Sequence, residues 1–151
     1  MCSSRPRGSI EKIRSSGGPV HLMDTNVVRE MMRPRPAEGV LRWGESVESM
    51  HLSVVTLEEI WFGLAAKPGA RLEKWFDEFC RDYCEIHPIT PAIARRTAWL
   101  RALRRGVSRP MIQADAFLAG TAAEHGLILV TRNVRDFEGC GIRLSDPFAP
   151  R

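Results

Sequence analysis

The sequence predicts an α/β fold: one domain with a central, mostly parallel sheet flanked by helices. From residue 20 onward, short apolar segments alternate with helical segments, as in strands joined by helical crossovers. Residues 127–131 (LILVT) are almost entirely apolar, which is typical of a strand buried on both faces of a parallel sheet. The chain has 151 residues, of which 44% are hydrophobic and 26% charged, so one domain can bury a sizeable core.

The first half of the domain is expected to contain two strands and four helices. We predict strands at 20–24 and 51–55, and helices at 27–33, 37–47, 57–67 and 70–85. Pro34 and Pro36 separate the first two helices, and Pro68 follows the third. The helix at 70–85 is strongly amphipathic, and its apolar face comprises Leu72, Trp75, Phe76 and Phe79.

The second half continues the alternation. We predict strands at 86–89, 127–131 and 142–146, and helices at 92–106 and 111–126. Gly106 and Gly126 are typical helix ends. Residues 1–19, by contrast, are rich in Ser, Gly, Pro and charge without apolar periodicity, so we predict a flexible tail followed by a domain at 20–151.

Composition favours a cytoplasmic protein, and its arginine content leaves an anionic partner and a high-GC genome equally open as explanations. The net charge is +4, and only three of the 22 basic residues are lysines. Arginine suits phosphate recognition, although a high-GC genome would also enrich it. No apolar run approaches the roughly 18 residues of a membrane helix, and the N-terminal segment lacks the apolar core of a secretory signal. We therefore expect no membrane association.

The four cysteines (Cys2, Cys80, Cys84 and Cys140) include no CxxC pair. Cys80, Cys84 and His87 have a spacing that a zinc site could use, but no fourth ligand is evident. Free thiols in a reducing compartment are therefore the favoured interpretation.

Two acidic positions lie where strands end and helices begin. Asp24 follows the first strand, where it could cap the next helix or point into the ligand zone beyond the carboxyl ends of the strands. Glu58 and Glu59 open the helix after the second strand. Thr56 and Glu59 fit a capping box, which leaves a structural and a functional interpretation of Glu59 equally open.

Asp115 is harder to explain by helix capping. At helical spacing it shares a face with four apolar residues: Met111, Leu118, Ala119 and Ala122. A carboxylate within an apolar stripe needs a cation or becomes protonated. Pairing with an arginine is one interpretation, and a metal-linked acid is the favoured one.

Thr131, Asn133 and Asp136 follow the apolar strand at 127–131. Asn133 could cap the next helix, with Asp136 in its first turn. Acids gathered at one edge of the sheet would repel one another, and a divalent cation relieves that repulsion. All-oxygen ligation favours Mg²⁺ or Mn²⁺ over zinc, and such an ion can activate water against a phosphate. These acids on an arginine-rich chain therefore predict metal-dependent phosphodiester hydrolysis.

Several segments in this order resemble the PIN-domain family, especially the VapC-type toxins of toxin–antitoxin modules and the FitB-like proteins. The segments are LMDTNVV, RPRP, LSVVTLEEIWFG, ADAFLAGTAAEHGLILVTRN and DPF, and the match runs from Val20 to about Phe148. The resemblance implies a single parallel-sheet domain with Mg²⁺- or Mn²⁺-dependent endoribonuclease activity. It also implies an RNA substrate, a homodimer, and inhibition by a small cognate antitoxin.

The resemblance also assigns site residues. Asp24 corresponds to the first acid, Glu59 to the second because it precedes the I-x-x-G step ending at Gly63, and Asp115 to the third; Asp24 and Asp115 are the expected metal ligands. Many relatives place an Asp directly after Thr-Arg, where this chain has Asn133. Either Asn133 or Asp136 therefore completes the site, with Asp136 as the catalytic candidate and Thr131 hydrogen-bonding into the cluster.

The resemblance also implies partner-binding surfaces and the first residue of the protein. Relatives begin four residues before the first acid, so we expect Val20 to be the true start. The family implies a dimer face and antitoxin groove built with aromatic residues, namely Trp61, Phe62, Trp75, Phe76 and Phe79; core packing is the alternative, and we expect it mainly for Trp75 and Phe79. The candidates for RNA contact are Arg95, Arg96, Arg101, Arg104, Arg105 and Arg109.

Three other functional classes are compatible with parts of the pattern. A catalytically silent module that binds nucleic acid or antitoxin and regulates its operon is the main alternative to the nuclease. A receiver domain would need a lysine near the late strands, yet the last lysine is Lys74. A phosphatase of the haloacid-dehalogenase type would need D-x-D after the first strand, and DTN does not match it.

Overall fold

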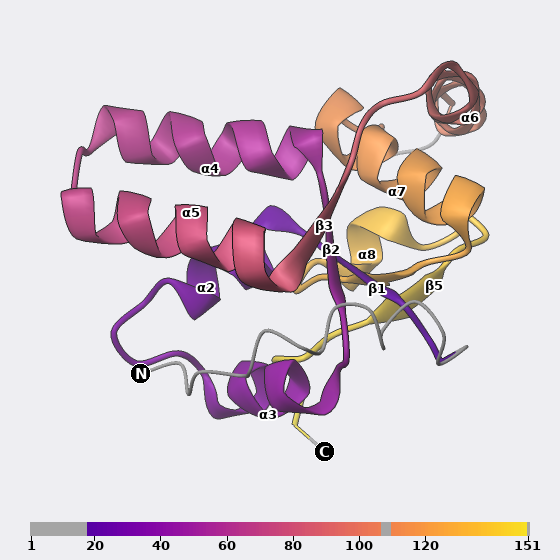
Figure 1. The fold of residues 1–151 in the computed structure, drawn as a ribbon. Coiled ribbons are helices and arrows are strands. Elements are labelled where there is room, and N and C mark those ends of the chain that lie inside the picture. The colour runs from indigo at the N-terminus through magenta and orange to yellow at the C-terminus, as the bar shows by residue number, and fades with distance from the viewer. Residues whose placement is uncertain (1–17, 107–109, 151) are drawn as a thin grey trace.

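The computed structural model describes residues 18–106 and 110–150, and all that follows concerns these residues (Figure 1). The predicted tail falls almost wholly outside them, and so does Arg109. The elements follow the order β1 (His21–Met23), α2 (Thr25–Met31), α3 (Glu38–Ser46), β2 (Met50–Ser53), α4 (Val54–Ala66), α5 (Ala70–Tyr83), β3 (Cys84–His87), α6 (Pro91–Leu103), α7 (Gln113–His125), β4 (Ile128–Val130), α8 (Val134–Phe137) and β5 (Arg143–Ser145).

The strands form one sheet in the order β3-β2-β1-β4-β5, and every pair in it is parallel. The predicted α/β fold with a sheet flanked by helices is confirmed. β1 lies in the centre, with His21 opposite Met50 of β2 and Leu22 opposite Leu129 of β4. Strands β2 and β3 thus lie on one side of β1, and strands β4 and β5 lie on the other. Ligands bind beyond the carboxyl ends of the strands at such a switch point, here between β1 and β4.

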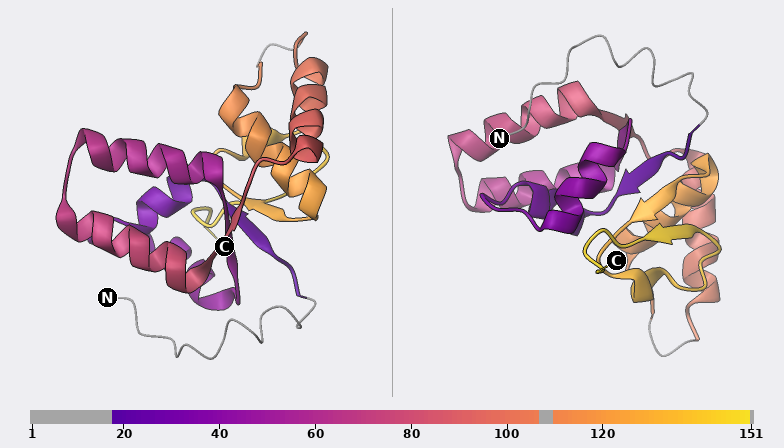
Figure 2. Two further views of the ribbon diagram at one scale, coloured as in Figure 1. Left: turned by 45° about the horizontal axis from the view of Figure 1, so that its top comes forward. Right: turned by 90° about the horizontal axis from the view of Figure 1, so that it is seen from below.

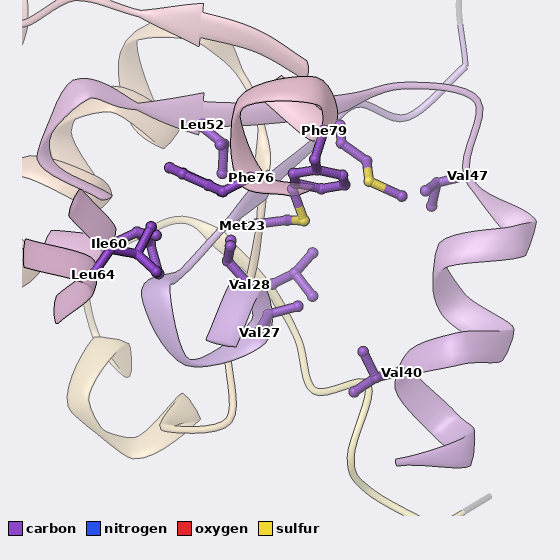
Figure 3. Packing of buried hydrophobic residues seen from close by; sticks show 12 residues of the cluster. Met23, Val27, Val28, Val40, Val47, Leu52, Ile60, Leu64, Phe76 and Phe79 are labelled. Atoms are coloured by element: carbon purple, nitrogen blue, oxygen red, sulfur yellow. The ribbon is translucent and has the colours of Figure 1, made fainter. Parts of the chain in front are cut away.

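Two cores cover the two faces of the sheet. On one face, Met23 and Leu52 pack with residues of α2, α4 and α5, among them Phe76 (Figure 3). On the other face, Leu22 packs with α7 and α8. The consecutive residues Leu22 and Met23 enter different cores because side chains alternate along a strand. α4 and α5 lie side by side and extend together beyond the sheet, away from α6 and α7 (Figures 1 and 2).

The junction of β2 and α4 comes earlier than the sequence predicted. Ser53 Oγ accepts a hydrogen bond from the Val55 N–H at 3.1 Å and caps α4, so Val54 and Val55 are helical. Their β-branched side chains favoured a longer strand. Thr56 consequently lies inside the helix, and the capping-box interpretation of Thr56 and Glu59 is wrong. The predicted strand at 86–89 is likewise shifted, because β3 begins at Cys84.

α6 and α7 pack closely because α7 presents small residues. Gly120 lies directly against Thr97, where an added Cβ would collide with the Thr97 hydroxyl. That hydroxyl donates to the Ala116 carbonyl at 3.3 Å. Gly126 ends α7 with φ 63°, the left-handed conformation that glycine adopts without strain. This packing holds in place the helix whose first turn carries Asp115.

Within the described ranges, none of the helices has the length and apolarity needed to cross a lipid bilayer.

Candidate active site

Asp24 lies directly after β1, at the switch point of the sheet. Its N–H donates to the Val130 carbonyl at 2.9 Å, which ties it to the end of β4. Its side chain is buried, with Oδ1 accepting from the Thr25 N–H at 2.6 Å and Oδ2 accepting from the Thr131 hydroxyl at 2.7 Å. Asp24 is also the N-cap of α2, so the capping role coexists with a carboxylate buried at the end of the strand.

The electrostatic surroundings of Asp24 favour its protonated form. Burial is the largest cause and raises its pKa above the ordinary 3.8. The charges of Glu59 and Asp136 raise this pKa further, whereas the hydrogen bonds from Thr131 and Thr25 lower it. Among the described residues, no positive group offsets the burial of the Asp24 carboxyl.

Glu59 joins the site from the second turn of α4. Its Oε2 accepts a hydrogen bond from the Thr25 hydroxyl at 2.5 Å. Because Thr25 follows Asp24, this bond links α4 to the end of β1. Of the two adjacent glutamates, Glu59 is half-buried and contacts Thr25, while Glu58 is exposed.

Asp115 reaches the same region from the first turn of α7. Burial is the main cause that raises its pKa to about 6, and the charges of the other three acids, Asp24, Asp136 and Glu59, add to the shift. In the part of the chain that the structure describes, no ion pair joins Asp115 to an arginine. The interpretation of Asp115 as the partner of an arginine thus has no support among those residues.

The segment after β4 completes the cluster. Thr131 is fully buried, and its hydroxyl both donates to Asp24 and accepts the Asn133 N–H at 3.0 Å. Asn133 occupies the N-cap of α8, but its exposed side chain makes no capping hydrogen bond. Asp136 lies in the first turn of α8, and its charge raises the pKa of both Asp24 and Asp115. Electrostatics therefore group Asp136, rather than Asn133, with the other acids.

Two residues of the site had no role in the sequence prediction. Thr25 holds Glu59, as described above. Asn26 Nδ2 donates to Asp24 Oδ2 at 3.3 Å, and its Oδ1 accepts the Arg132 N–H at 3.2 Å. Both are small polar residues directly after the first acid, where the strand turns into the helix. That position was the signal in the sequence that could have indicated their role in the site.

The donor set of the four acids fits a hard divalent cation. It offers only carboxylate oxygens, which Mg²⁺ and Mn²⁺ prefer. Burial first and like charge second raise the pKa values of Asp24 and Asp115, and a bound cation would offset both. The four acids do not crowd together. Among the described His, Cys, Asp and Glu residues, the only set of three with ligand atoms within 4.8 Å of one another is His51, Glu85 and His87, elsewhere on the sheet. A spaced carboxylate set suits Mg²⁺, which retains several waters and contacts one or two carboxylates directly.

The predicted aromatic residues divide between core and surface. Phe76 and Phe79 are buried, and Trp75 stacks on Phe79 with ring centroids 4.9 Å apart. Core packing of Trp75 and Phe79 is therefore confirmed. Trp61 is 37% exposed and Phe62 is 70% exposed, so these two residues of α4 remain available to a partner.

Two of the predicted RNA-contacting arginines serve the fold. Arg96 forms an ion pair with Glu124 at 2.5 Å, which joins α6 to α7. Arg104 donates to the backbone carbonyls of Glu138 and Asp136, which joins α6 to α8. Three other candidates, Arg95, Arg101 and Arg105, are exposed on α6 and directly after it.

The zinc interpretation of Cys80, Cys84 and His87 is wrong on geometric grounds. Cys84 and His87 are three residues apart on β3, and side chains at odd spacing on a strand point to opposite faces. Cys80, Cys84 and Cys140 are free thiols, as predicted. His87 instead meets His51 across the β2–β3 pair, a contact that the sequence prediction missed because the two residues are 36 positions apart.

Comparison with known proteins gives a consistent result. The family model of the PIN domain matches residues 22–139. The VapC ribonuclease Y4jK of Sinorhizobium fredii is 30% identical over 137 residues, which cover 85% of this chain and 98% of that protein. Toxin FitB of Neisseria gonorrhoeae is 27% identical over 135 residues, which cover 84% of this chain and 97% of that toxin.

A solved structure supports the same fold. The crystal structure of FitAcB from Neisseria gonorrhoeae superposes with a TM-score of 0.74 and 26% sequence identity. The match covers 87% of this chain and 100% of that chain. The likeness is therefore one of overall fold over most of the chain.

Proposed function

Because this chain belongs to the PIN-domain family, we propose that it is a ribonuclease and the toxin of a toxin–antitoxin module, which hydrolyses RNA phosphodiester bonds at its acidic cluster. The observation that carries the proposal is the convergence of Asp24, Glu59, Asp115 and Asp136 at the switch point of the sheet. The likeness to the VapC ribonuclease Y4jK and to toxin FitB agrees with it.

The cofactor is Mg²⁺ or Mn²⁺, held by Asp24 and Asp115 with Glu59 and Asp136 close by. Such an ion, when bound, neutralises charge on the scissile phosphate and makes a water ligand more acidic. The chain itself supplies orientation: Thr131 and Asn26 fix the Asp24 carboxylate through hydrogen bonds. Thr25 fixes one oxygen of Glu59 and leaves the second to accept a proton from the attacking water.

The RNA backbone meets basic side chains at the rim of the site. Arg132 follows Thr131; its backbone N–H donates to Asn26 Oδ1, and its guanidinium lies 4.4 Å from the centre of the Phe148 ring. The exposed arginines Arg95, Arg101 and Arg105 extend the basic surface along α6. This distribution gives phosphate contacts without base recognition, so the binding step is salt-dependent.

The antitoxin binds a groove between α2 and the α4–α5 pair. The groove has a volume of about 420 Å³ and is lined by Arg29, Met32, Arg33, Pro34, Ile60, Gly63, Leu64, Lys67 and Leu72. Apolar walls with a basic rim suit an amphipathic segment that carries acidic residues. Trp61 and Phe62 lie exposed on the same helix, α4. A second set of exposed apolar residues, Trp99, Leu103 and Ile112, provides a face for the expected homodimer.

The direct test is induced expression in a bacterial host without the antitoxin, followed by mapping of cleaved RNA. Wild type should arrest growth and produce new RNA 5′ ends. Asp115→Asn should do neither. Glu58→Gln is the matched control because Glu58 is exposed beside Glu59 and should behave as wild type.

Two results would contradict the proposal. One is growth arrest and identical RNA ends with Asp115→Asn. The other is a folded, antitoxin-free wild type that neither arrests growth nor cuts RNA, which would support the silent binding module instead.

A further inference from the structure

A histidine cluster lies on β2 and β3, away from the acidic site. The chain has four histidines, and three of them, His51, His87 and His125, contact one another. His51 Nδ1 and His87 Nε2 are 2.6 Å apart, and their rings stack with centroids separated by 4.9 Å. The His125 ring, at the end of α7, lies 4.6 Å from that of His87.

A carboxylate completes the same cluster. In the parallel pairing of β2 and β3, Glu85 stands opposite His51, and Ser53 stands opposite His87. The side chains of Glu85 and His87 therefore project from the same face of β3. The side chain of His51, on the neighbouring strand, projects from that same face of the sheet. The His51 Nε2 and Glu85 Oε2 atoms are 3.8 Å apart. One ligand atom from each of His51, Glu85 and His87 lies within 4.8 Å of the others.

We propose that His51, Glu85 and His87, with His125 adjacent, form a second metal site that takes Zn²⁺ or a similar transition-metal ion. Two or three imidazoles with one carboxylate are the ligands of such ions and not of Mg²⁺. A tetrahedral zinc ion with Zn–N distances of about 2.1 Å holds its nitrogen ligands about 3.4 Å apart. With His51 Nδ1 and His87 Nε2 as the ligand atoms, that separation needs a ring movement of about 1 Å from their present 2.6 Å, and His51 Nε2 remains beside Ser49 Oγ.

The surroundings meet the other requirements of a metal site. His51 and His87 are buried, so their rings are held by packing, whereas Glu85 and His125 are exposed and leave an entry path. Ser49 Oγ lies 3.3 Å from His51 Nε2 and can orient that ring. The three ligands come from β2 and β3, so a bound ion ties the edge strand to its neighbour, with the His125 ring of α7 beside it.

The site is separate from the acidic cluster. Asp115 and His125 lie ten residues apart on α7, which corresponds to about 15 Å along the helix axis. The fourth histidine, His21, points away, because it contacts Trp43 of α3 in an edge-on arrangement with ring centroids 5.8 Å apart. His21 therefore provides a matched histidine control.

The test uses full-length protein without an affinity tag, titrated with Zn²⁺ by calorimetry and with Co²⁺ by absorbance in the presence of excess Mg²⁺. Wild type should bind one equivalent, show the intensified absorbance of four-coordinate Co²⁺, and unfold at a higher temperature with Zn²⁺. Glu85→Gln and His87→Asn should weaken Zn²⁺ binding by about 10- to 100-fold. His21→Asn and Asp115→Asn should bind as wild type does.

Two ligand variants separate a loss of Zn²⁺ binding from a loss of the fold. Glu85 is exposed, so Glu85→Gln retains the fold even where His87→Asn unfolds. Binding that survives in Glu85→Gln and His87→Asn, or that is lost in Asp115→Asn, would overturn the proposal. Failure of wild type to bind Zn²⁺ or Co²⁺ would overturn it equally.

Discussion

Two clusters of ionisable groups on one sheet respond to burial in opposite ways. At the carboxyl ends of β1 and β4, burial raises the pKa of Asp24 and brings that of Asp115 to about 6. On β2 and β3, burial first and the neighbouring His87 second lower the pKa of His51 to about 4. Burial favours the neutral form in both places, which is the protonated form of a carboxyl and the unprotonated form of an imidazole.

The difference shows what each cluster needs. Burial and the charges of neighbouring acids oppose the ionised forms of Asp24 and Asp115, so a cation or a proton stabilises this cluster. The lowered pKa values of His51 and His87 keep these two imidazoles neutral near pH 7, so they present lone pairs without competition from protons. Acid should therefore stabilise the first cluster and destabilise the second, and the following variants separate the two effects.

The largest expected effect on stability comes from metal at the acidic cluster. Wild type in Mg²⁺ at 100 times its Kd should gain about 2.7 kcal/mol of unfolding free energy over the protein in EDTA. Asp24→Asn should gain almost nothing, because Asp24 is one of the two proposed ligands. Urea unfolding at pH 7 measures both. An equal gain in Asp24→Asn would place the Mg²⁺ effect elsewhere.

Asp115→Asn should stabilise the metal-free protein at neutral pH. The folded-state pKa of Asp115 is about 6, above its ordinary 3.8, so the folded state binds the proton first and stability falls as pH rises between about 4 and 6. The shift corresponds to about 3 kcal/mol, which solvent screening at this half-buried group reduces to about 1–2 kcal/mol. Unfolding in EDTA should show that gain at pH 7 and none near pH 4. A variant less stable than wild type at pH 7 would contradict this.

His51→Gln should flatten the acid side of the stability profile. The pKa of His51 is about 4 in the fold and 6.5 otherwise, so the unfolded state binds the proton first and stability falls as pH drops through this window. The groups facing His51 are Ser49, Glu85 and His87, and the charges of His125 and His21 also act on it. Wild type should lose about 1 kcal/mol more than His51→Gln between pH 6.5 and 4, after allowance for screening. Parallel profiles would show that His51 does not titrate in this way.

The smallest effect is expected from Thr25→Val. This change removes the hydroxyl that holds Glu59 but keeps all four acids. RNA cleavage should fall about two- to fivefold, the value of one hydrogen bond, without a change in Mg²⁺ binding. Thr121→Val is the matched control, because the Thr121 hydroxyl bonds only to the Phe117 carbonyl of α7 at 2.7 Å. Equal losses in both variants would assign the effect to packing.

Much of the fold was predictable because local pattern and tertiary structure agree. The apolar run at 127–131 became β4, and Gly126 ended α7 as expected. The junction of β2 and α4 was not predictable in the same way, because Val54 and Val55 favour a strand while the Ser53 cap starts a helix. A side-chain hydrogen bond there outweighed the propensity of two residues.

The acidic cluster was inferred from acids at strand ends, whereas the histidine cluster was not. Asp24 and Thr131 each follow a strand, so parallel pairing alone brings them together. His51 and His87 lie within strands, and their contact depends on the register of β2 against β3. Without that register, the only histidine-containing set that the sequence offered was Cys80, Cys84 and His87, and free thiols were preferred to zinc there.

The central claim is that the acidic cluster is a metal-dependent ribonuclease site. Its most direct test is cleavage of end-labelled RNA by purified, antitoxin-free wild type and Asp115→Asn, with Mg²⁺ titrated from EDTA-treated protein. We expect cleavage that rises with Mg²⁺ and saturates in wild type, with a rate at least about 100-fold lower in Asp115→Asn. Equal rates in the two proteins, or wild-type cleavage that persists undiminished in EDTA, would contradict the claim.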